Sequence, residues 1–542
     1  MLGSKLAAWA MALGAVSTVL AADRVPVTGV QVPNGGAVPL RQNINNVRGP
    51  QWDLLVRALQ AMYDADPADP RSFFQIAGIH GKPYIEYNGA GGRQSSGWAG
   101  YCPHGEHLFL TWHRPYLALY EQELVGQARR LAAQYPPNVR AQYQQAADSL
   151  RAPFWDWGSD QSVPPATVAP RTRVNVPNGQ GVQLVEVDNP FATFRFPQRA
   201  LNGEFGQFDP QPRNQIYRCL SPNNYPGSAN QNLQGRPYKQ WIYDAFTRSN
   251  SFEQFASAEG GGVGLEQIHN GVHWDGACGG QFLSLDFTAY DPLFMLHHAN
   301  VDRLWAYWEA IHTDQTVFSQ TYEGMSRFAT PEGTPISADS PLEPFFQASG
   351  PMHTSVTASR LRDFGYTYEG LEYWQKNPDQ MRNDATSLIN RLYGPSRGMQ
   401  ALGRFDAQQQ TRYYVNLAVD VAQVERPSTI NVFVNNMYAG NLVIMQQPGM
   451  GIKNGTIPLD DVVNASGFAR QNPDRVVDSI KKSVQVSIVK GDGTPIPVSS
   501  VPSLKLEVED IPFTPARDQT VLPKFGQPRH TPVQPADHPQ SK

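Results

Sequence analysis

Two separated groups of histidines are the residues of this chain best suited to chemistry. Each group offers three imidazoles, and neutral imidazole binds copper, zinc, iron or nickel. Two all-nitrogen groups without a carboxylate among them favour copper. The sequence therefore predicts a centre of two copper ions that handles O2. Its six ligands are His80, His104 and His113 for one ion, and His269, His273 and His298 for the other.

The second group is placed by helical spacing. His269 and His273 are four residues apart, so on a helix they share one face. Asp291-Pro292 is typical of a helix start and predicts a helix from Asp291 to Ile311.

Two adjacent histidines of that helix compete for the third ligand position. His298 belongs to the apolar stripe that is expected to face inward, whereas His297 is turned about 100° from it. We therefore predict His298 as the ligand, with His297 and Phe294 in the pocket wall. Asp302 is expected to accept a hydrogen bond from a ring N–H; a surface pair of Asp302 with Arg303 is the open alternative. The stripe comprises Phe294, His298, Val301, Trp305 and Trp308.

The first group combines a helix with loops. Thr111 is expected to cap a helix whose first turn carries His113, and residues 116–130 are expected to be helical. His104 must then approach from the preceding loop, and His80 from a separate segment. His107 is the competing ligand, because His104 and His107 could also chelate one ion.

The chain has three cysteines, an odd number. A disulfide between Cys219 and Cys278 is one expectation. Cys102 is then left over, two residues before His104, and a covalent link between them would fix the loop histidine.

Three segments carry a family resemblance. They resemble the copper-binding regions of the type 3 copper tyrosinases and catechol oxidases (polyphenol oxidases), in particular the secreted fungal ones, over about residues 45–370. The segments are Tyr101-Cys-Pro-His-Gly-Glu-His-Leu-Phe-Leu-Thr-Trp-His-Arg-Pro-Tyr116, Glu266-Gln-Ile-His-Asn-Gly-Val-His273 and Asp291-Pro-Leu-Phe-Met-Leu-His-His-Ala-Asn-Val-Asp-Arg303.

The resemblance implies a mainly α catalytic domain with a four-helix bundle around the dicopper centre. It implies a thioether between Cys102 and His104, and a closing tyrosine pair in Tyr366-Thr-Tyr368. It also implies that Glu266 and Asn270 position a water that deprotonates monophenols, with Leu285 as the gate over the second copper. The alternative for Glu266 and Asn270 is a plain pair on a helix surface.

The implied activity is oxidation of small phenols by O2. Monophenols would be hydroxylated to o-diphenols, and o-diphenols oxidised to o-quinones, as in melanin-type pigment formation. Catechol oxidase or o-aminophenol oxidase activity is the alternative within this class. A haemocyanin-like O2 carrier is a distant one, and a zinc hydrolase is disfavoured because His269-x-x-x-His273 lacks the glutamate of His-Glu-x-x-His.

The organisation of the chain follows from composition. Its 542 residues suggest at least two domains. We predict a signal peptide at 1–21, the catalytic domain at 22–390 and a linker at 391–408. A smaller β-sandwich is predicted at 409–515, where the sequence alternates, and a disordered Pro-rich tail at 516–542.

The resemblance gives the C-terminal part a role. It is similar to the domain that shields the copper pocket of latent relatives until a protease cuts the linker, and Phe433 is one candidate for the side chain that plugs the pocket. The other expected partners are small phenols. A net charge of -4 disfavours nucleic acid. No apolar run suits a membrane span, so we expect a secreted glycoprotein with sequons at Asn454 and Asn464.

Overall fold

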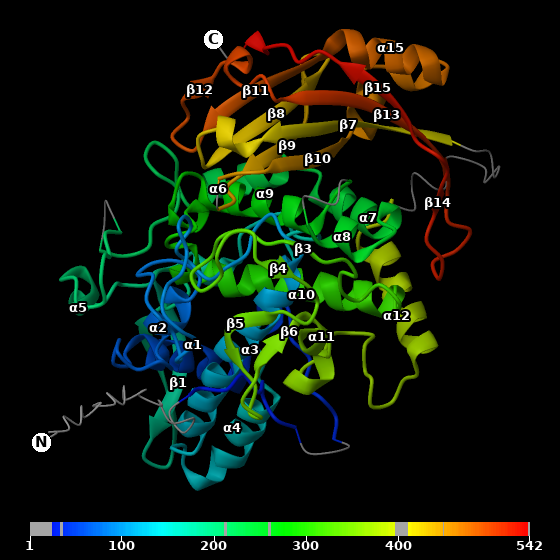
Figure 1. Ribbon diagram of the computed structural model, residues 1–542. Coiled ribbons are helices and arrows are strands. Elements are labelled where there is room, and N and C mark those ends of the chain that lie inside the picture. Colours follow the sequence, from blue (N-terminus) through cyan, green and yellow to red (C-terminus); the bar gives the residue numbers. More distant parts are fainter. Residues whose placement is uncertain are drawn as a thin grey trace, which may run out of the picture.

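A helical core carries a β-rich C-terminal part on one side (Figure 1). This computed structural model describes residues 24–32, 36–210, 214–257, 262–395, 410–447 and 449–539. The predicted signal peptide and most of the predicted linker lie outside the described residues. The described helical part ends at residue 395, and the described C-terminal part begins at residue 410.

Two long helices form the centre of the molecule, and each is buried on nearly every side. They are α3 (Leu108–Ala132) and α10 (Leu293–Ile311). A helix that is apolar or tightly packed all round belongs in the interior of a large domain. Around these two lie α1 (Gly49–Tyr63), α2 (Phe73–Gly78), α4 (Pro137–Ser149), α7 (Tyr238–Arg248), α9 (Leu265–Ala277) and α12 (Pro378–Leu392).

The helix predictions are confirmed for α10 and need a correction for α3. α3 begins at Leu108, with His107 at its N-cap, and Thr111 lies inside the helix, where its hydroxyl donates to Leu108 O at 3.2 Å. Pro115 does not end the helix, because the surrounding core holds it in place. His113 therefore lies in the second turn, on a more rigid support than the predicted helix end.

The stretch 158–240, which is rich in Pro, Gly and Asn, contains regular structure. β1 (Arg171–Asn178) and β2 (Gly181–Asp188) form an antiparallel hairpin. An alternating pattern around the Gly179-Gln180 turn is the signal that could have predicted it. The other short elements are α5 (Gln198–Leu201), α6 (Gly227–Gln234), α8 (Phe252–Ala256), β3 (Tyr322–Glu323), β4 (Pro335–Ile336), β5 (Pro341–Phe346), β6 (Met352–Thr354) and α11 (Ser355–Ala358).

The C-terminal part contains two sheets. One has the strand order β10-β7-β13-β14 with β15 also on β13, and the other has the order β12-β11-β8-β9. The alternation of the sequence within 409–515 predicts strands, and the alternating segments 413–419, 430–434 and 484–489 all lie in strands. The strands are β7 (Gln410–Asp420), β8 (Ser428–Val434), β9 (Met437–Ile444), β10 (Ile452–Pro458), β11 (Val484–Lys490), β12 (Pro495–Ile496), β13 (Lys505–Thr514), β14 (Lys524–Phe525) and β15 (Arg529–Val533), with helices α14 (Asp460–Ala465) and α15 (Pro473–Ser483).

The prediction of a disordered tail is wrong for residues 524–533. β14 and β15 both pair with β13. Arg529 adds ion pairs to Asp510 and Asp474, at 2.9 Å and 2.7 Å. Backbone pairing to an available strand overrides the Pro-rich composition that suggested disorder.

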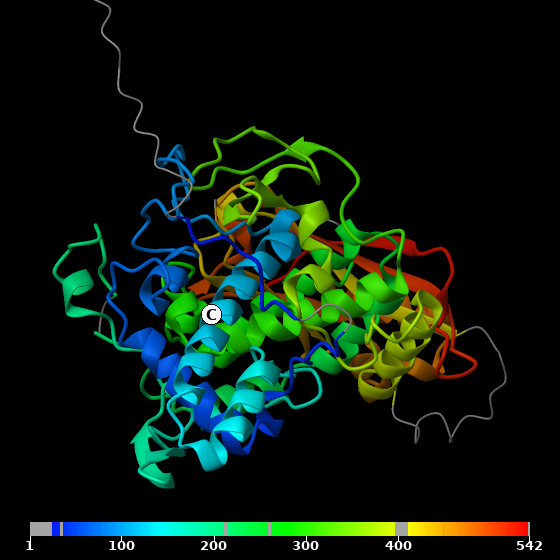
Figure 2. The same cartoon turned by 90° about the horizontal axis from the view of Figure 1, so that it is seen from below.

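Partly buried ion pairs hold the C-terminal part against the helices. Arg412 of β7 pairs with Asp244 of α7 and with Asp460, and Arg248 pairs with Glu509 of β13. Seen from below, the helices lie in front of the C-terminal strands (Figure 2).

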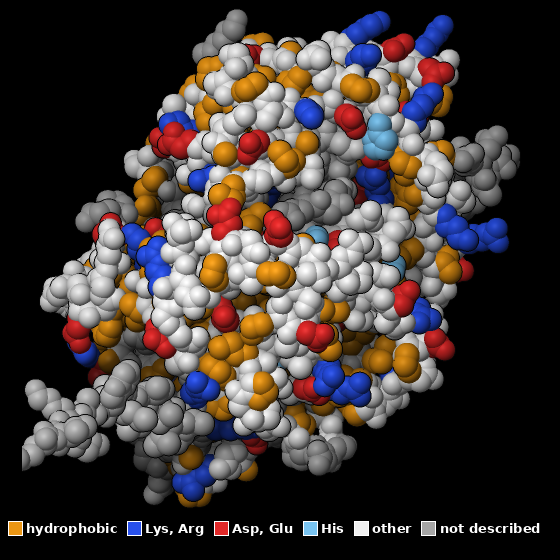
Figure 3. All heavy atoms as spheres, in the orientation of Figure 1, with side chains coloured by type: hydrophobic (Ala, Val, Ile, Leu, Met, Phe, Trp, Pro, Cys, Tyr) orange, Lys and Arg blue, Asp and Glu red, His pale blue; other side chains and the backbone are white. Residues whose placement is uncertain are grey.

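In the described ranges, no helix combines the length and the apolar character needed to cross a bilayer. On the face drawn in Figure 3, acidic and basic side chains are interspersed.

Candidate dicopper centre

The second histidine group converges on one point in the interior. His269 and His273 project from α9, and His298 projects from α10. His269 Nε2 lies 3.0 Å from His273 Nε2 and 3.1 Å from His298 Nε2. All three rings are buried. Nitrogens bound to one ion at about 2.0–2.1 Å are separated by about this distance.

The hydrogen bonds of the outer ring nitrogens show why a cation fits there. His273 Nδ1 donates to Phe282 O at 2.7 Å, and His269 Nδ1 is bonded to Asn270 Oδ1 at 2.9 Å. With the proton on Nδ1, each Nε2 presents a lone pair. Two lone pairs facing each other at 3.0 Å repel unless a positive ion lies between them, so the geometry fits a metal ion.

The first group is built from a helix and two loops, as predicted. His80 follows α2, His104 lies in the loop before α3, and His113 lies in α3. His80 Nδ1 donates to Leu285 O at 3.2 Å, and His113 Nδ1 donates to Phe109 O at 2.6 Å. Their Nε2 atoms are buried without a hydrogen-bond partner among the described residues. This donor set also suits a metal ion.

The first group is more open than the second. The donor atoms of His80, Cys102 and His104 lie within 4.8 Å of one another. The ring of His113 lies 5.8 Å from that of His80 and 5.5 Å from that of His104, centroid to centroid. His107 is not part of the group. Its Nδ1 is bonded to Ser257 Oγ at 3.1 Å.

The two groups meet in the centre of the fold. The rings of His113 and His298 stack with centroids 4.3 Å apart. Phe294 lies between the groups, with its ring 4.2 Å from that of His298 and 5.0 Å from that of His80. Six imidazoles far apart in the sequence therefore form one cluster, with a phenylalanine in its wall.

His297 lies closer to the second group than its position on the helix, turned about 100° from the inward stripe, predicts. Its donor atom lies within 4.8 Å of those of His269, His273 and His298. Its ring stacks on the ring of His269 at 4.8 Å, and neither of its nitrogens has a hydrogen-bond partner in the described ranges. The side chain thus contacts the ligand set directly, as a fourth imidazole.

Burial keeps the imidazoles neutral. Desolvation lowers the pKa of His113 and of His273 to about 3. Desolvation, followed by the neighbouring histidines, lowers the pKa of His80, His104, His269 and His298 well below the ordinary value. A neutral imidazole is the form that binds metal, so protons do not compete at neutral pH.

The predicted bond from His298 to Asp302 is wrong. Asp302 is held by Arg41 at 2.9 Å and Arg114 at 2.6 Å, and His298 Nδ1 has no hydrogen-bond partner among the described residues. The alternative pair with Arg303 is also wrong, because Arg303 pairs with Asp156.

The tyrosine pair completes this buried network. Tyr366 and Tyr368 each donate a hydroxyl to Asp302 Oδ2 at 2.7 Å. The guanidinium of Arg41 lies 3.4 Å from the ring centroid of Tyr366. Asp302 therefore ties α10 to α3 and to the end of the catalytic part, behind the histidines.

Glu266 and Asn270 are fully buried, so a helix-surface pair is excluded. Glu266 Oε1 accepts the backbone N–H of Gly105, the residue after His104, at 2.7 Å. Asn270 holds His269, and its Nδ2 is buried without a hydrogen-bond partner among the described residues. Both side chains thus touch residues of the centre.

Leu285 takes part through its backbone. Its carbonyl holds the ring of His80, a member of the first group, and its side chain is buried. This role of the carbonyl was not predicted.

The sequence analysis also missed the C-terminal residues that reach the centre. Gln446, between β9 and β10, packs so closely on Gly105 that a Cβ there would lie 3.0 Å from its Nε2. Lys453 Nζ donates to Gln446 Oε1 at 3.2 Å, and both side chains are buried. The charge of Lys453 contributes to the lowered pKa of His104, after burial and three histidines.

Phe433, the candidate plug, lies elsewhere. Its ring stacks on His538 at 3.9 Å and contacts Tyr438. Both partners belong to the C-terminal part, so the prediction of Phe433 as the plug is wrong. β8 directs this ring into its own domain, and no sequence pattern fixes which strand residue faces the helices.

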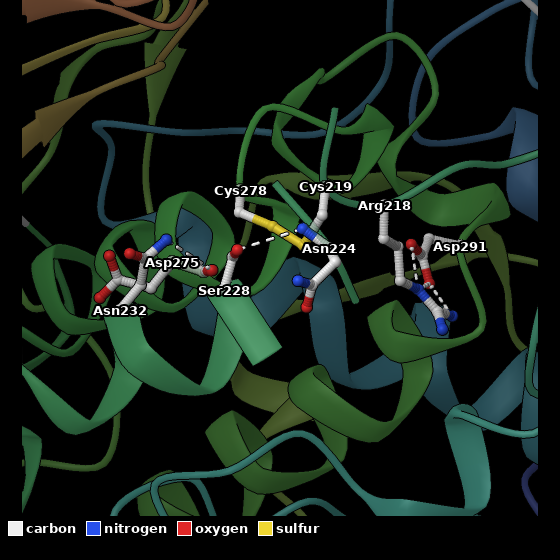
Figure 4. Close-up of a disulfide and its surroundings, with 8 residues drawn as sticks. All are labelled: Arg218, Cys219, Asn224, Ser228, Asn232, Asp275, Cys278 and Asp291. Carbon is white, nitrogen blue, oxygen red and sulfur yellow. Dashed lines mark hydrogen bonds and ion pairs between the residues drawn. A yellow bond between two sulfur atoms is a disulfide. The ribbon is translucent and has the colours of Figure 1, made fainter. Parts of the chain in front are cut away.

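The three cysteines form one disulfide and leave one free thiol, as predicted. Cys219 and Cys278 form a disulfide, with Cα atoms 4.5 Å apart (Figure 4). Cys102 is a buried free thiol, and desolvation raises its pKa.

Comparisons with known proteins agree with this geometry. Residues 70–311 match the common central domain of tyrosinase. A tyrosinase of Podospora anserina is 31% identical over 415 residues, which cover 68% of this chain and 69% of that protein. Polyphenol oxidase 2 of Agaricus bisporus is 32% identical over 385 residues, 68% of each chain. The chain belongs to the tyrosinase family.

Solved structures of tyrosinases share the fold over 95–96% of this chain. A recombinant mushroom tyrosinase superposes with a TM-score of 0.80 at 22% identity, and covers 95% of this chain and 100% of that one. An Aspergillus oryzae pro-tyrosinase superposes with a TM-score of 0.73 at 20% identity, and covers 96% and 99%.

Proposed function

We propose that this protein is a copper enzyme that oxidises phenols with O2. It hydroxylates monophenols to o-diphenols and oxidises o-diphenols to o-quinones. The observation that carries the proposal is the convergence of the Nε2 atoms of His269, His273 and His298 at 3.0–3.1 Å beside a second imidazole group, in a chain of the tyrosinase family. Zinc hydrolysis lacks support, because no carboxylate belongs to the donor sets found among the described residues.

The histidines are held in a fixed orientation that suits metal binding. The backbone carbonyls of Leu285, Phe109 and Phe282 hold the outer nitrogens of His80, His113 and His273, so the inner nitrogens face the metal positions. A bound copper pair supplies the electrons that O2 requires. Burial excludes bulk water from the site.

Glu266 and Asn270 support the monophenolase reaction. A monophenol must lose its hydroxyl proton before it reacts, and a buried carboxylate beside an amide can hold the water that takes it. Asn270 Nδ2 is a donor without a protein partner among the described residues. We assign the gate over the second copper to Leu285, an aliphatic side chain that leaves room for a ring.

The experiment compares tyrosine with catechol as substrates. Glu266→Gln keeps the acceptor for Gly105 but removes the charge. We expect hydroxylation of tyrosine to fall about 100-fold or more, with catechol oxidation retained. Glu253→Gln, a glutamate in α8, is the matched control. Equal loss on both substrates would contradict the assigned role of Glu266.

Two outcomes would favour the other functions. If catechol gives o-quinone while tyrosine never reacts, the protein is a catechol oxidase or an o-aminophenol oxidase. If O2 binds reversibly and catechol gives no quinone, the protein is a haemocyanin-like carrier.

We further propose that the chain as given is a latent form. Gln446 and Lys453 lie over the loop of His104, and Gln267 of α9 exchanges two hydrogen bonds of 3.1 Å with the backbone of Thr456. A phenol could not reach the centre past these groups. Cleavage by a protease near residues 390–405 should raise catechol turnover, and full turnover by the uncut chain would refute latency.

A thioether between Cys102 and His104 is also proposed. The thiol and the imidazole donor atoms lie within 4.8 Å. Forming the C–S bond removes one hydrogen from each partner, two electrons and two protons in all, which O2 can accept. Mass spectrometry of the peptide that spans both residues should show the loss of two hydrogen atoms, absent in Cys102→Ala.

Secretion, glycosylation and the packing of helices and sheets complete the proposal. Residues 1–21 act as the signal peptide, and Asn464 is exposed and suits glycosylation. Asn454 suits it poorly, because Thr456 of its sequon is buried and bonded to Gln267. We also propose that the helices around the histidines form a four-helix bundle and that the two C-terminal sheets form a sandwich.

A further inference from the structure

The Cys219–Cys278 disulfide lies at the end of the helix that carries His269 and His273. Cys278 caps α9, and both cysteines adopt left-handed backbone angles, with φ of +53° at Cys219 and +34° at Cys278. Residues other than glycine rarely hold such angles unless their surroundings impose them. The backbone at both ends of the disulfide is therefore closely constrained.

Backbone hydrogen bonds extend this constraint. Cys219 N–H donates to Ala277 O at 2.9 Å, and Gln281 N–H donates to Tyr217 O at 3.2 Å. Gly280 allows the approach, because a Cβ there would lie 2.5 Å from Tyr217 O. Segment 217–220 is thus fastened along the turn 277–281 that follows α9.

This turn leads directly to a group that orients a proposed copper ligand. Phe282 follows Gln281, and its carbonyl accepts the Nδ1 proton of His273 at 2.7 Å. The same carbonyl accepts the hydroxyl of Thr288 at 2.7 Å. The position of this carbonyl decides which nitrogen of His273 faces the metal.

The residue before Cys219 fixes the other helix of the second group. Arg218 pairs with Asp291 at 2.6 Å, and Asp291 Oδ1 caps α10 by accepting Leu293 N–H at 2.8 Å. Arg218 also donates to the carbonyls of Thr167 and Phe191, at 3.0 Å and 3.1 Å. Figure 4 shows the disulfide and the Arg218–Asp291 pair side by side.

We propose that the Cys219–Cys278 disulfide, together with the adjacent Arg218–Asp291 ion pair, positions the second histidine group for its copper ion. The disulfide holds the end of α9 and the Phe282 carbonyl, and the ion pair holds the start of α10. The four residues of the disulfide and the ion pair are positioning residues, because none of them belongs to the proposed metal ligands. The inference rests on the proposed copper function.

The test is copper binding by the full chain and by Cys219→Ser/Cys278→Ser. Metal-free protein is titrated with Cu(I) against a coloured chelator. We expect the variant to bind one ion as the wild type does and the other about 10–100-fold more weakly, the usual effect of losing a partner that orients a metal ligand. Ser228→Ala, in the neighbouring α6, is the matched control and should bind both ions normally.

A spectroscopic readout separates positioning from general destabilisation. Two coupled Cu(II) ions give no EPR signal, whereas a single Cu(II) does. Oxidised variant at limiting copper should therefore show an isolated Cu(II) signal that the wild type lacks. If the double variant does not fold, Gly280→Ala, which pushes segment 217–220 away while keeping the disulfide, should show the same selective loss.

Two results would overturn the inference. One is unchanged affinity for both ions in the folded variants, and the other is equal weakening of both ions. A wild-type chain that binds no copper pair would instead refute the proposed function.

Discussion

At the scale of single residues, backbone carbonyls rather than carboxylates orient three of the six proposed ligand histidines, which are His80, His113 and His273. Leu285, Phe109 and Phe282 provide these carbonyls. Asp302 instead neutralises two buried arginines, Arg41 and Arg114. This leaves Asp302 with a structural role whose loss can be measured.

Replacing Asp302 with asparagine should destabilise the protein strongly. Arg41 and Arg114 would remain buried without their shared partner, which costs about 3–5 kcal/mol of unfolding free energy. Urea unfolding measures this. Asp379→Asn, which breaks an exposed pair with Arg382, should change little. A similar small effect for both variants would show that the network is not essential.

The carboxyl group of Asp302 also predicts that the free energy of unfolding depends on pH. Burial alone would raise the pKa of Asp302, but Arg114 and Arg41 outweigh it and lower the pKa below 3.8. The stability that its charge contributes is therefore complete above the ordinary carboxyl pKa and is lost as the pH falls through the depressed value. The difference in unfolding free energy between wild type and Asp302→Asn should be constant near neutral pH and shrink below about pH 5. A constant difference down to pH 2 would contradict the assignment.

Spacing within one helix predicted much at this scale. It correctly predicted that His269 and His273 share one helix face and that His298 faces inward. It failed for Asp302, which faces Arg41 from 261 residues away. Such long-range partners leave no periodic signal in a single sequence.

At the scale of elements, two loops and one helix fix the first histidine group, whereas two helices fix the second. Gly81 lies against the backbone of residues 285 and 286, and a Cβ there would lie 2.5 Å from Leu285 O. This contact brings the carbonyl to the ring of His80. The helix bearing His298 could be predicted from its cap and stripe, but this loop contact could not, because loops carry no period.

Gly81→Ala should therefore weaken one copper site. The added methyl group displaces the Leu285 carbonyl from His80, and we expect the affinity for one of the two ions to fall about 10–100-fold. The Cu(I) titration described above measures it. Gly92→Ala, where nothing lies near the added Cβ, is the control, and equal binding by both variants would rule out this role.

At the scale of the molecule, the helical core and the C-terminal strands meet along α7 and α9. Gly440 of β9 packs on Trp241 of α7, so that a Cβ would lie 2.9 Å from Trp241 Cζ2. The resemblance of the sequence indicated a shield here, and alternation predicted its strands. The surface it covers could not be predicted, because docking depends on residues such as Gly440 that carry no distinctive pattern.

Gly440→Val should loosen this contact. Overpacking costs about 1–3 kcal/mol, and we expect the uncut chain to oxidise catechol faster than wild type and to melt at a lower temperature. Gly181→Val, in the exposed hairpin, is the control. A lower melting temperature without any gain in turnover would argue against shielding.

The docking of β9 on α7 has a consequence for the product of the proposed cleavage. Trp241 is fully enclosed in the intact chain, so shedding the C-terminal strands uncovers a large indole and its apolar neighbours to water. Newly bared aromatic surface promotes self-association. The cleaved enzyme should therefore self-associate more than its precursor. Light scattering of both forms at equal concentration measures this difference.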